Sequence, residues 1–203
     1  VLRESNDGIK KQLAGLSRDD FSEVYLFFDY DAHQTNLERE IDEDVIRQML
    51  ESFDNETENG KLYISYPMVE ALRDYEQGKC GNGVDCFVEV NDIVNYKNAS
   101  AARARNPHFK EYDIGAWKDI IDVFAMKVSC LYGMSGMIEY DQYFGKVTPS
   151  NIYSMELKEA NMHRTFVLSA FPEFLLDYFG VKLWKTSVRH RKIQRDSLEC
   201  KCV

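Results

Sequence analysis

The sequence predicts an α/β fold, with a mostly parallel sheet in the N-terminal half and a mainly helical C-terminal half. Three observations lead to this prediction. An uninterrupted apolar run at 24–28 ends abruptly at Asp29. An amphipathic helical pattern then covers 41–53, and a second short apolar run, 62–66, is closed by Pro67. Strand, helix and strand in this order are typical of a βαβ unit, whose two strands lie parallel and whose crossover is right-handed.

The first strand is preceded by a helical pattern over 3–16, which Gly8 and Gly15 weaken. A polar break at 17–20 separates this pattern from the apolar run at 24–28. Because the run is apolar at every position, we expect helices to cover both faces of the strand, as in a buried parallel sheet.

The helix predicted at 41–53 begins with three acidic residues, 42–44, which the positive end of the helix dipole favours. Its apolar residues fall on one face: Ile41, Val45, Ile46, Met49, Leu50 and Phe53. A polar stretch at 54–60 ends the helix, and a further helix at 68–75 follows the second strand directly.

The pattern changes after a glycine-rich turn at 78–83. The elements expected beyond it are a brief strand and three helices: 87–90, 116–132, 151–162 and 170–179. Gly180 is expected to stop the last helix. The two stronger helices should bury six apolar side chains: Trp117, Ile121, Phe124, Phe171, Leu175 and Tyr178. The chain is thereby divided into an α/β core at 1–78 and a mainly helical region at 79–203, which ends in a basic tail.

Composition favours a compact cytoplasmic protein. The 203 residues are 44% hydrophobic, which is ample for a core and excludes disorder throughout. No apolar run is long enough to span a bilayer, and no basic and apolar leader opens the sequence, so we expect no membrane association. The five cysteines show no spacing typical of zinc sites, and their odd number indicates reduced thiols. A net charge of −9 argues against a protein that wraps nucleic acid over its whole surface.

The chemistry-bearing pattern is the pair Asp29 and Asp31 at the end of the first strand. Side chains alternate along an extended chain, so both carboxylates point to the same side. Ligands of open parallel sheets bind at the carboxyl ends of the strands, and paired carboxylates suit Mg²⁺ or Mn²⁺. The alternative is that the two aspartates cap the following loop, which is a common role of this residue type. Glu70, just beyond the second strand, is the third candidate ligand if the two strands are neighbours.

The runs VYLFFDYDAH (24–33) and GKLYISYPMVEAL (60–72) resemble the core of a Toprim domain, the fold shared by topoisomerases, primases and OLD-type nucleases. The resemblance is nearest to the Toprim-like proteins of bacterial phage defence and abortive infection. It implies a Rossmann-like sheet on which Asp29 and Asp31 bind Mg²⁺, with Glu70 as the acidic residue after the next strand. The family also carries a glutamate at the end of an earlier strand, which we expect upstream of Val1.

The resemblance implies a Mg²⁺-dependent nuclease, or a defence effector derived from one, that cleaves phosphodiesters of DNA or RNA. Asp29 and Asp31 would hold the metal, with Glu70 assisting or holding a second ion. The acidic composition then implies a partner, such as an ATPase subunit, that delivers the nucleic acid.

Two other hypotheses remain open. A haloacid-dehalogenase-like phosphatase also places Asp-x-Asp after an apolar strand, but it expects Thr or Val where this chain has His33. The third hypothesis is a non-catalytic regulatory or assembly module whose acidic residues are structural.

Overall fold

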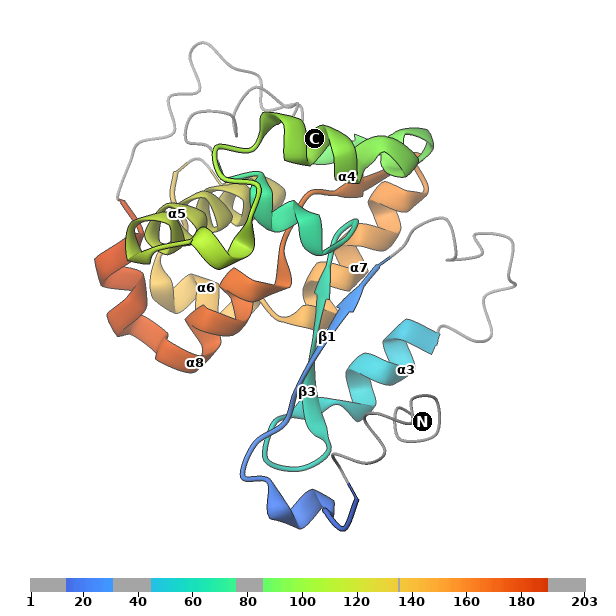
Figure 1. Ribbon diagram of the computed structural model, residues 1–203, viewed down its shortest axis with the longest axis vertical. Helices are drawn as coiled ribbons and strands as arrows, with labels where there is room; N and C mark the ends of the chain where they lie inside the picture. Colours follow the sequence, from blue (N-terminus) through green and yellow to red (C-terminus); the bar gives the residue numbers. More distant parts are fainter. Residues whose placement is uncertain (1–13, 31–44, 76–85, 135, 190–203) are drawn as a thin grey trace.

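A small three-stranded sheet organises the N-terminal part of the computed structural model, which describes residues 14–30, 45–75, 86–134 and 136–189 (Figure 1). Strand β1 (Tyr25–Asp29) pairs in parallel with β3 (Gly60–Ser65), in a register that runs from Tyr25 opposite Lys61 to Asp29 opposite Ser65. Helix α3 (Val45–Ser52) lies between them in sequence. The prediction of two neighbouring parallel strands with a helix between them is therefore confirmed.

Strand β2 (Asp54–Asn55) forms a hairpin with β3 that the sequence pattern did not reveal. It pairs antiparallel with the start of β3, so the order in the sheet is β1-β3-β2. The hairpin turn requires Gly60, whose φ is +115°. A Cβ on Gly60 would lie 3.2 Å from Cγ1 and 3.3 Å from the carbonyl oxygen of Val24, so a larger residue would meet both unfavourable backbone geometry and a close contact.

The expectation that the first strand is covered on both faces is wrong for β1. In the described sheet β1 is one of the two edge strands, and Phe27 and Phe28 are 38% and 42% exposed. The covered strand is β3, where all residues but Lys61 are buried. An apolar run shows that a strand packs against neighbours, but it does not show whether the strand is central or at the edge.

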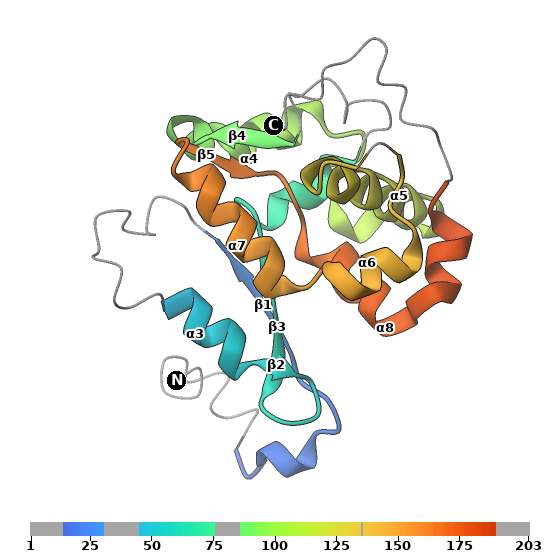
Figure 2. The same ribbon diagram turned by 180° about the vertical axis from the view of Figure 1, so that it is seen from behind.

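Helices lie on both sides of β3 (Figures 1 and 2). On one side is α8 (Ala170–Ser187), whose Phe171 ring stacks on Phe27 at 4.8 Å between centroids. On the other side are α3 and α7 (Pro149–Ala160), which also contact each other. The sheet is thus the middle layer of an α/β arrangement, as the sequence predicted.

The rest of the described chain is mainly helical. Beyond the sheet it comprises α4 (Ile93–Arg103), α5 (Ile114–Leu131), α6 (Tyr140–Lys146) and the short 3-10 segment η2 (Val69–Arg73). Strands β4 (Phe87–Glu89) and β5 (Arg164–Phe166) pair antiparallel in a second sheet. The helix predicted at 68–75 is therefore only the 3-10 segment η2, whereas the helices predicted at 116–132, 151–162 and 170–179 are present with shifted ends. No helix in these described segments is long and apolar enough to cross a membrane.

The main core cluster contains residues from both sides of the predicted boundary at residue 78, including Ile64 of β3 and Phe124 of α5. Of the six side chains expected to be buried, Ile121 and Phe124 are 1% and 3% exposed. Trp117, Phe171 and Leu175 are partly buried. Tyr178 is 54% exposed, so its predicted burial is wrong; its ring instead packs against other aromatic rings near the surface.

Gly180 does not stop α8 as predicted. The helix continues to Ser187, with a kink at Gly180, whose φ is +61° and ψ −150°. The hydroxyl oxygen of Tyr140 lies 3.3 Å from the position that a Cβ of Gly180 would occupy. Glycine therefore serves here as a bend that brings the second part of α8, with the buried Trp184, against α6.

Several predictions concern residues outside the described parts of the chain. These are most of the helix at 3–16, the start of the helix at 41–53, Asp31 and His33, three of the five cysteines, and most of the basic tail. The remaining cysteines, Cys86 and Cys130, are buried and form no disulfide.

Candidate metal centre

Asp29 is the last residue of β1 and is exposed to solvent. Its register partner on β3 is Ser65. Because side chains alternate along a strand, Asp29 shares a face with Phe27, and the stacking of Phe27 on Phe171 identifies that face as the one toward α8. The structure therefore places one predicted ligand at the carboxyl edge of two parallel strands, where the sequence analysis expected it.

Tyr30, which separates Asp29 from Asp31, turns to the opposite face. It is 4% exposed, and its ring lies 5.1 Å from the ring of Tyr66 and 6.3 Å from that of Tyr153, between centroids. Its backbone N–H donates to the carbonyl of Ser65 at 3.0 Å, so the parallel pairing continues one residue past β1. The burial of Tyr30 beside the exposed Asp29 fits the predicted alternation of side chains. The same-side placement of Asp31 stays a prediction.

The amino end of α8 lies beside this strand edge. The hydroxyl of Ser65 accepts a hydrogen bond from the N–H of Ala170 at 3.2 Å. The hydroxyl of Ser169, the N-cap, accepts from the N–H of Phe171 at 3.3 Å. The two serine hydroxyls thus accept hydrogen bonds from backbone N–H groups of the first helical turn, which have no partner within the helix.

Glu70 lies in η2 and is 7% exposed. Its carboxylate is paired with Lys97 of α4, at 3.2 Å between Oε1 and Nζ. Figure 1 shows η2 continuing from the end of β3 toward α4, away from the course of β1. The structure therefore shows Glu70 engaged with a lysine, and its part in metal binding stays a prediction.

The described residues fit a cation site only in part. Within the segments that the structure covers, no three His, Cys, Asp or Glu side chains are grouped to hold a metal ion. Asp29 fits as one hard oxygen ligand for Mg²⁺ or Mn²⁺. A second carboxylate would come from Asp31, and Glu70 would have to exchange Lys97 for the cation.

The structure also contains two buried glutamates that the sequence did not signal. Glu173, in the first turns of α8, is 4% exposed, and Oε1 has no hydrogen-bond partner among the described residues. Burial first, and the nearby Asp177 second, raise the pKa of Glu173 to about 8, against a smaller opposite effect of Lys61. Burial likewise raises the pKa of Glu156 to about 8, although the N–H of Phe166 donates to its Oε2 at 2.9 Å. Glutamate is common on exposed helix faces, so its spacing gives no sign of burial.

A second group of charges joins α8 to the sheet. Asp177 pairs with Lys61 and accepts a hydrogen bond from the hydroxyl of Tyr63 at 2.7 Å. Burial, together with this hydrogen bond, raises the pKa of the Tyr63 hydroxyl. Lys61 stands near the amino end of β3, whereas Asp29 stands at the carboxyl end of β1. These charges therefore hold α8 in place and are not part of the candidate centre.

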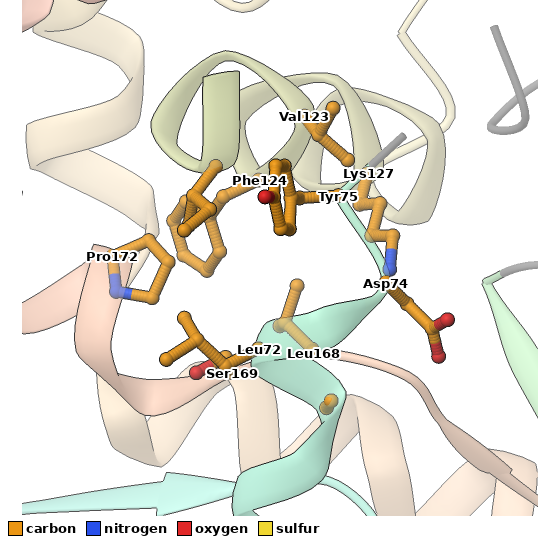
Figure 3. A pocket seen from close by; sticks show the side chains of 11 residues that line it. Leu72, Asp74, Tyr75, Val123, Phe124, Lys127, Leu168, Ser169 and Pro172 are labelled. Carbon is orange, nitrogen blue, oxygen red and sulfur yellow. The ribbon is translucent and has the colours of Figure 1, made fainter. Parts of the chain in front are cut away.

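A small cavity lies between η2, α5 and the start of α8 (Figure 3). Its volume is about 10 Å³, close to the space that one water molecule needs. Lys127 lines it and donates to the carbonyl of Val167 at 2.9 Å. The cavity is too small for a substrate.

No family model matches this chain, and no curated protein and no solved structure matches it significantly.

Proposed function

We propose that this chain is a Mg²⁺- or Mn²⁺-dependent hydrolase of nucleic-acid phosphodiesters with a Toprim-like core. One observation carries the proposal: Asp29 is exposed at the carboxyl end of a strand that runs parallel to, and in register with, β3. This edge is where parallel sheets bind ligands and where a hard carboxylate can reach a cation.

In the proposed site, Asp29 and Asp31 bind the cation, and the buried Tyr30 fixes the strand end that presents them. A bound divalent cation supplies a more acidic water and neutralises charge on a phosphoryl group. Ser65 and the amino end of α8 set the position of β3 beside Asp29. Glu70 binds the cation only if its ion pair with Lys97 is replaced by a bond to the metal. In a phage-defence setting, a partner such as an ATPase subunit would deliver substrate to this acidic chain.

The test is cleavage of plasmid DNA, structured RNA and a small phosphodiester, with Mg²⁺ or Mn²⁺. Asp29→Ala and Asp31→Ala should each abolish cleavage, because removing a carboxylate from the site lowers metal affinity directly. Glu51→Ala is the matched control, since Glu51 is an exposed carboxylate on α3. Its cleavage rate should equal that of the parent.

Activity that survives both aspartate substitutions would contradict the proposal. Turnover of a phosphomonoester with phosphate attached to Asp29 would replace it with the phosphatase mechanism.

An assembly module without catalysis is the second candidate, and the exposed aromatic edge of β1 favours it. Phe27 and Phe28 are large apolar side chains at a sheet edge, a location that often mediates association. Such a module should show no shift in melting temperature with Mn²⁺ that depends on Asp29. A shift that Asp29→Ala removes would exclude it.

A further inference from the structure

The end of α4 and the segment after it form an unusually basic stretch for this chain. Residues 97–110 contain four Lys or Arg residues, one histidine and no acidic residue, in a protein of net charge −9. All five are exposed. Four of them are here called the α4 basic surface: Lys97, Arg105, His108 and Lys110. Arg103 is not counted, because it is held by Asp74 and lies over the ring of Tyr96.

Arg73 of η2 contacts both parts of this surface, the helix α4 and the segment after it. Its Nε donates to the carbonyl of Pro107 at 3.1 Å and its Nη1 to the carbonyl of Lys97 at 3.3 Å. Its guanidinium also lies 5.2 Å from the ring centre of Phe109. A single side chain thus ties the backbone of α4 to the segment that carries His108 and Lys110, so this segment lies beside Lys97 in space as well as in sequence.

In the two ion pairs of this surface, the cationic partner is the more exposed one. Lys97 is paired with Glu70 and Arg105 with Asp119, the latter at 3.5 Å. Both cationic side chains are 69% exposed, whereas the two carboxylates are 9% and 19% exposed. The acidic partners lie beneath the cations and orient them, and the ammonium and guanidinium groups remain accessible to an anion.

The α4 basic surface lies at the end of the molecule toward which the strands point. Figures 1 and 2 both show β1 and β3 running toward the half that carries α4. Asp29 ends β1 in the same direction. The α4 basic surface and the carboxyl ends of β1 and β3 therefore lie in the same half of the molecule.

We propose that the α4 basic surface binds the sugar–phosphate backbone of the nucleic-acid substrate. This inference rests on the proposed function and names the substrate contact of the same site. Several exposed cations gathered on one surface match the repeated charge of a phosphate backbone, which supplies most sequence-independent affinity. Because the proposed contact is to phosphates, binding should show little base preference.

The experiment measures binding without cleavage. Fluorescence anisotropy in EDTA would compare labelled duplex DNA, single-stranded DNA and RNA over a range of salt concentrations. Lys97→Gln/Arg105→Gln/Lys110→Gln should weaken binding by about tenfold or more at low salt, and should reduce the duplex salt slope by about 0.9 for each phosphate that the variant no longer neutralises. The matched control is Lys146→Gln/Lys158→Gln/Lys185→Gln, which removes equal charge from exposed sites elsewhere and should bind as the parent does.

Lys97 also neutralises the buried Glu70, so the triple variant can lose stability. Arg105→Gln/Lys110→Gln keeps that pair and should still lower affinity and salt slope. Equal weakening by the test and control variants, or no binding by the parent, would overturn the inference. Cleavage of a small phosphodiester needs no such surface, so that assay judges the proposed hydrolase separately. Asp29→Ala should bind nucleic acid normally while losing cleavage.

Discussion

The buried Glu173 predicts an unusual dependence of stability on pH. The charged and titratable groups near it come from several elements. They are Asp177 on its own helix, Lys61 and Tyr63 on β3, Tyr66 just after β3, Tyr132 just after α5, and Tyr143 on α6. The pKa of Glu173 is raised from 4.5 to about 8, chiefly by burial. Between these two pH values the folded state holds a proton that the unfolded state has released. The free energy of unfolding therefore falls as pH rises from about 4.5 to about 8.

The magnitude follows from the size of the shift. Each unit of pKa difference corresponds to about 1.4 kcal/mol, so a shift of this size costs the folded state on the order of a few kcal/mol at pH 8. Glu173→Gln keeps the shape of the side chain and removes the ionisation. The variant should gain stability of that order at pH 8 and should resemble the parent near pH 5.

Urea unfolding at pH 5, 6, 7 and 8 measures this effect. The parent should lose stability across the series, and Glu173→Gln should lose much less. Glu156 titrates in the same direction, so the single variant keeps part of the slope and Glu156→Gln/Glu173→Gln should flatten it further. Glu51→Gln, on an exposed site, should follow the parent. A Glu173→Gln curve parallel to that of the parent would refute the reasoning.

Two further predictions concern stability alone. Phe124→Ala should lower the free energy of unfolding by about 3–5 kcal/mol in urea titrations, because Phe124 is 3% exposed in the main core; a variant that unfolds like the parent would show that the core is placed wrongly. Gly60→Ala should cost about 1 kcal/mol or more, since the φ of +115° and the contact with Val24 both disfavour a Cβ, and an unchanged melting temperature would contradict this.

The βαβ unit could be predicted from the sequence because its signals are local. A continuous apolar run, a helical repeat and a second apolar run each report on one element, and the connection between them limits the pairing. The same signals did not predict correctly how far the first strand is buried. The run at 24–28 does not reveal that β1 lies at the edge of the sheet formed by the described residues, because an aromatic side chain stacked on one helix gives the same apolar pattern as one that is fully covered.

The long-range partners could not be predicted. Two contacts depend on how η2 packs against α4: the ion pair between Glu70 and Lys97, and the hydrogen bond from Arg73 to the Lys97 carbonyl. No periodic pattern in the sequence specifies this packing. Burial of Glu173 is equally invisible, since only the packing of α5, α6 and β3 around α8 removes it from water. Asp29 was predictable because a strand end fixes where its side chain can lie.

Calorimetric titration of Mn²⁺ into the parent and Asp29→Asn at neutral pH tests the central claim most directly. This variant keeps the size and polarity of the side chain and removes only the charge. The parent should bind Mn²⁺ saturably, Asp29→Asn should lose that binding, and Glu51→Gln should keep it. Equal binding by the parent and Asp29→Asn, or none by the parent, would contradict a divalent-cation site at the carboxyl end of β1.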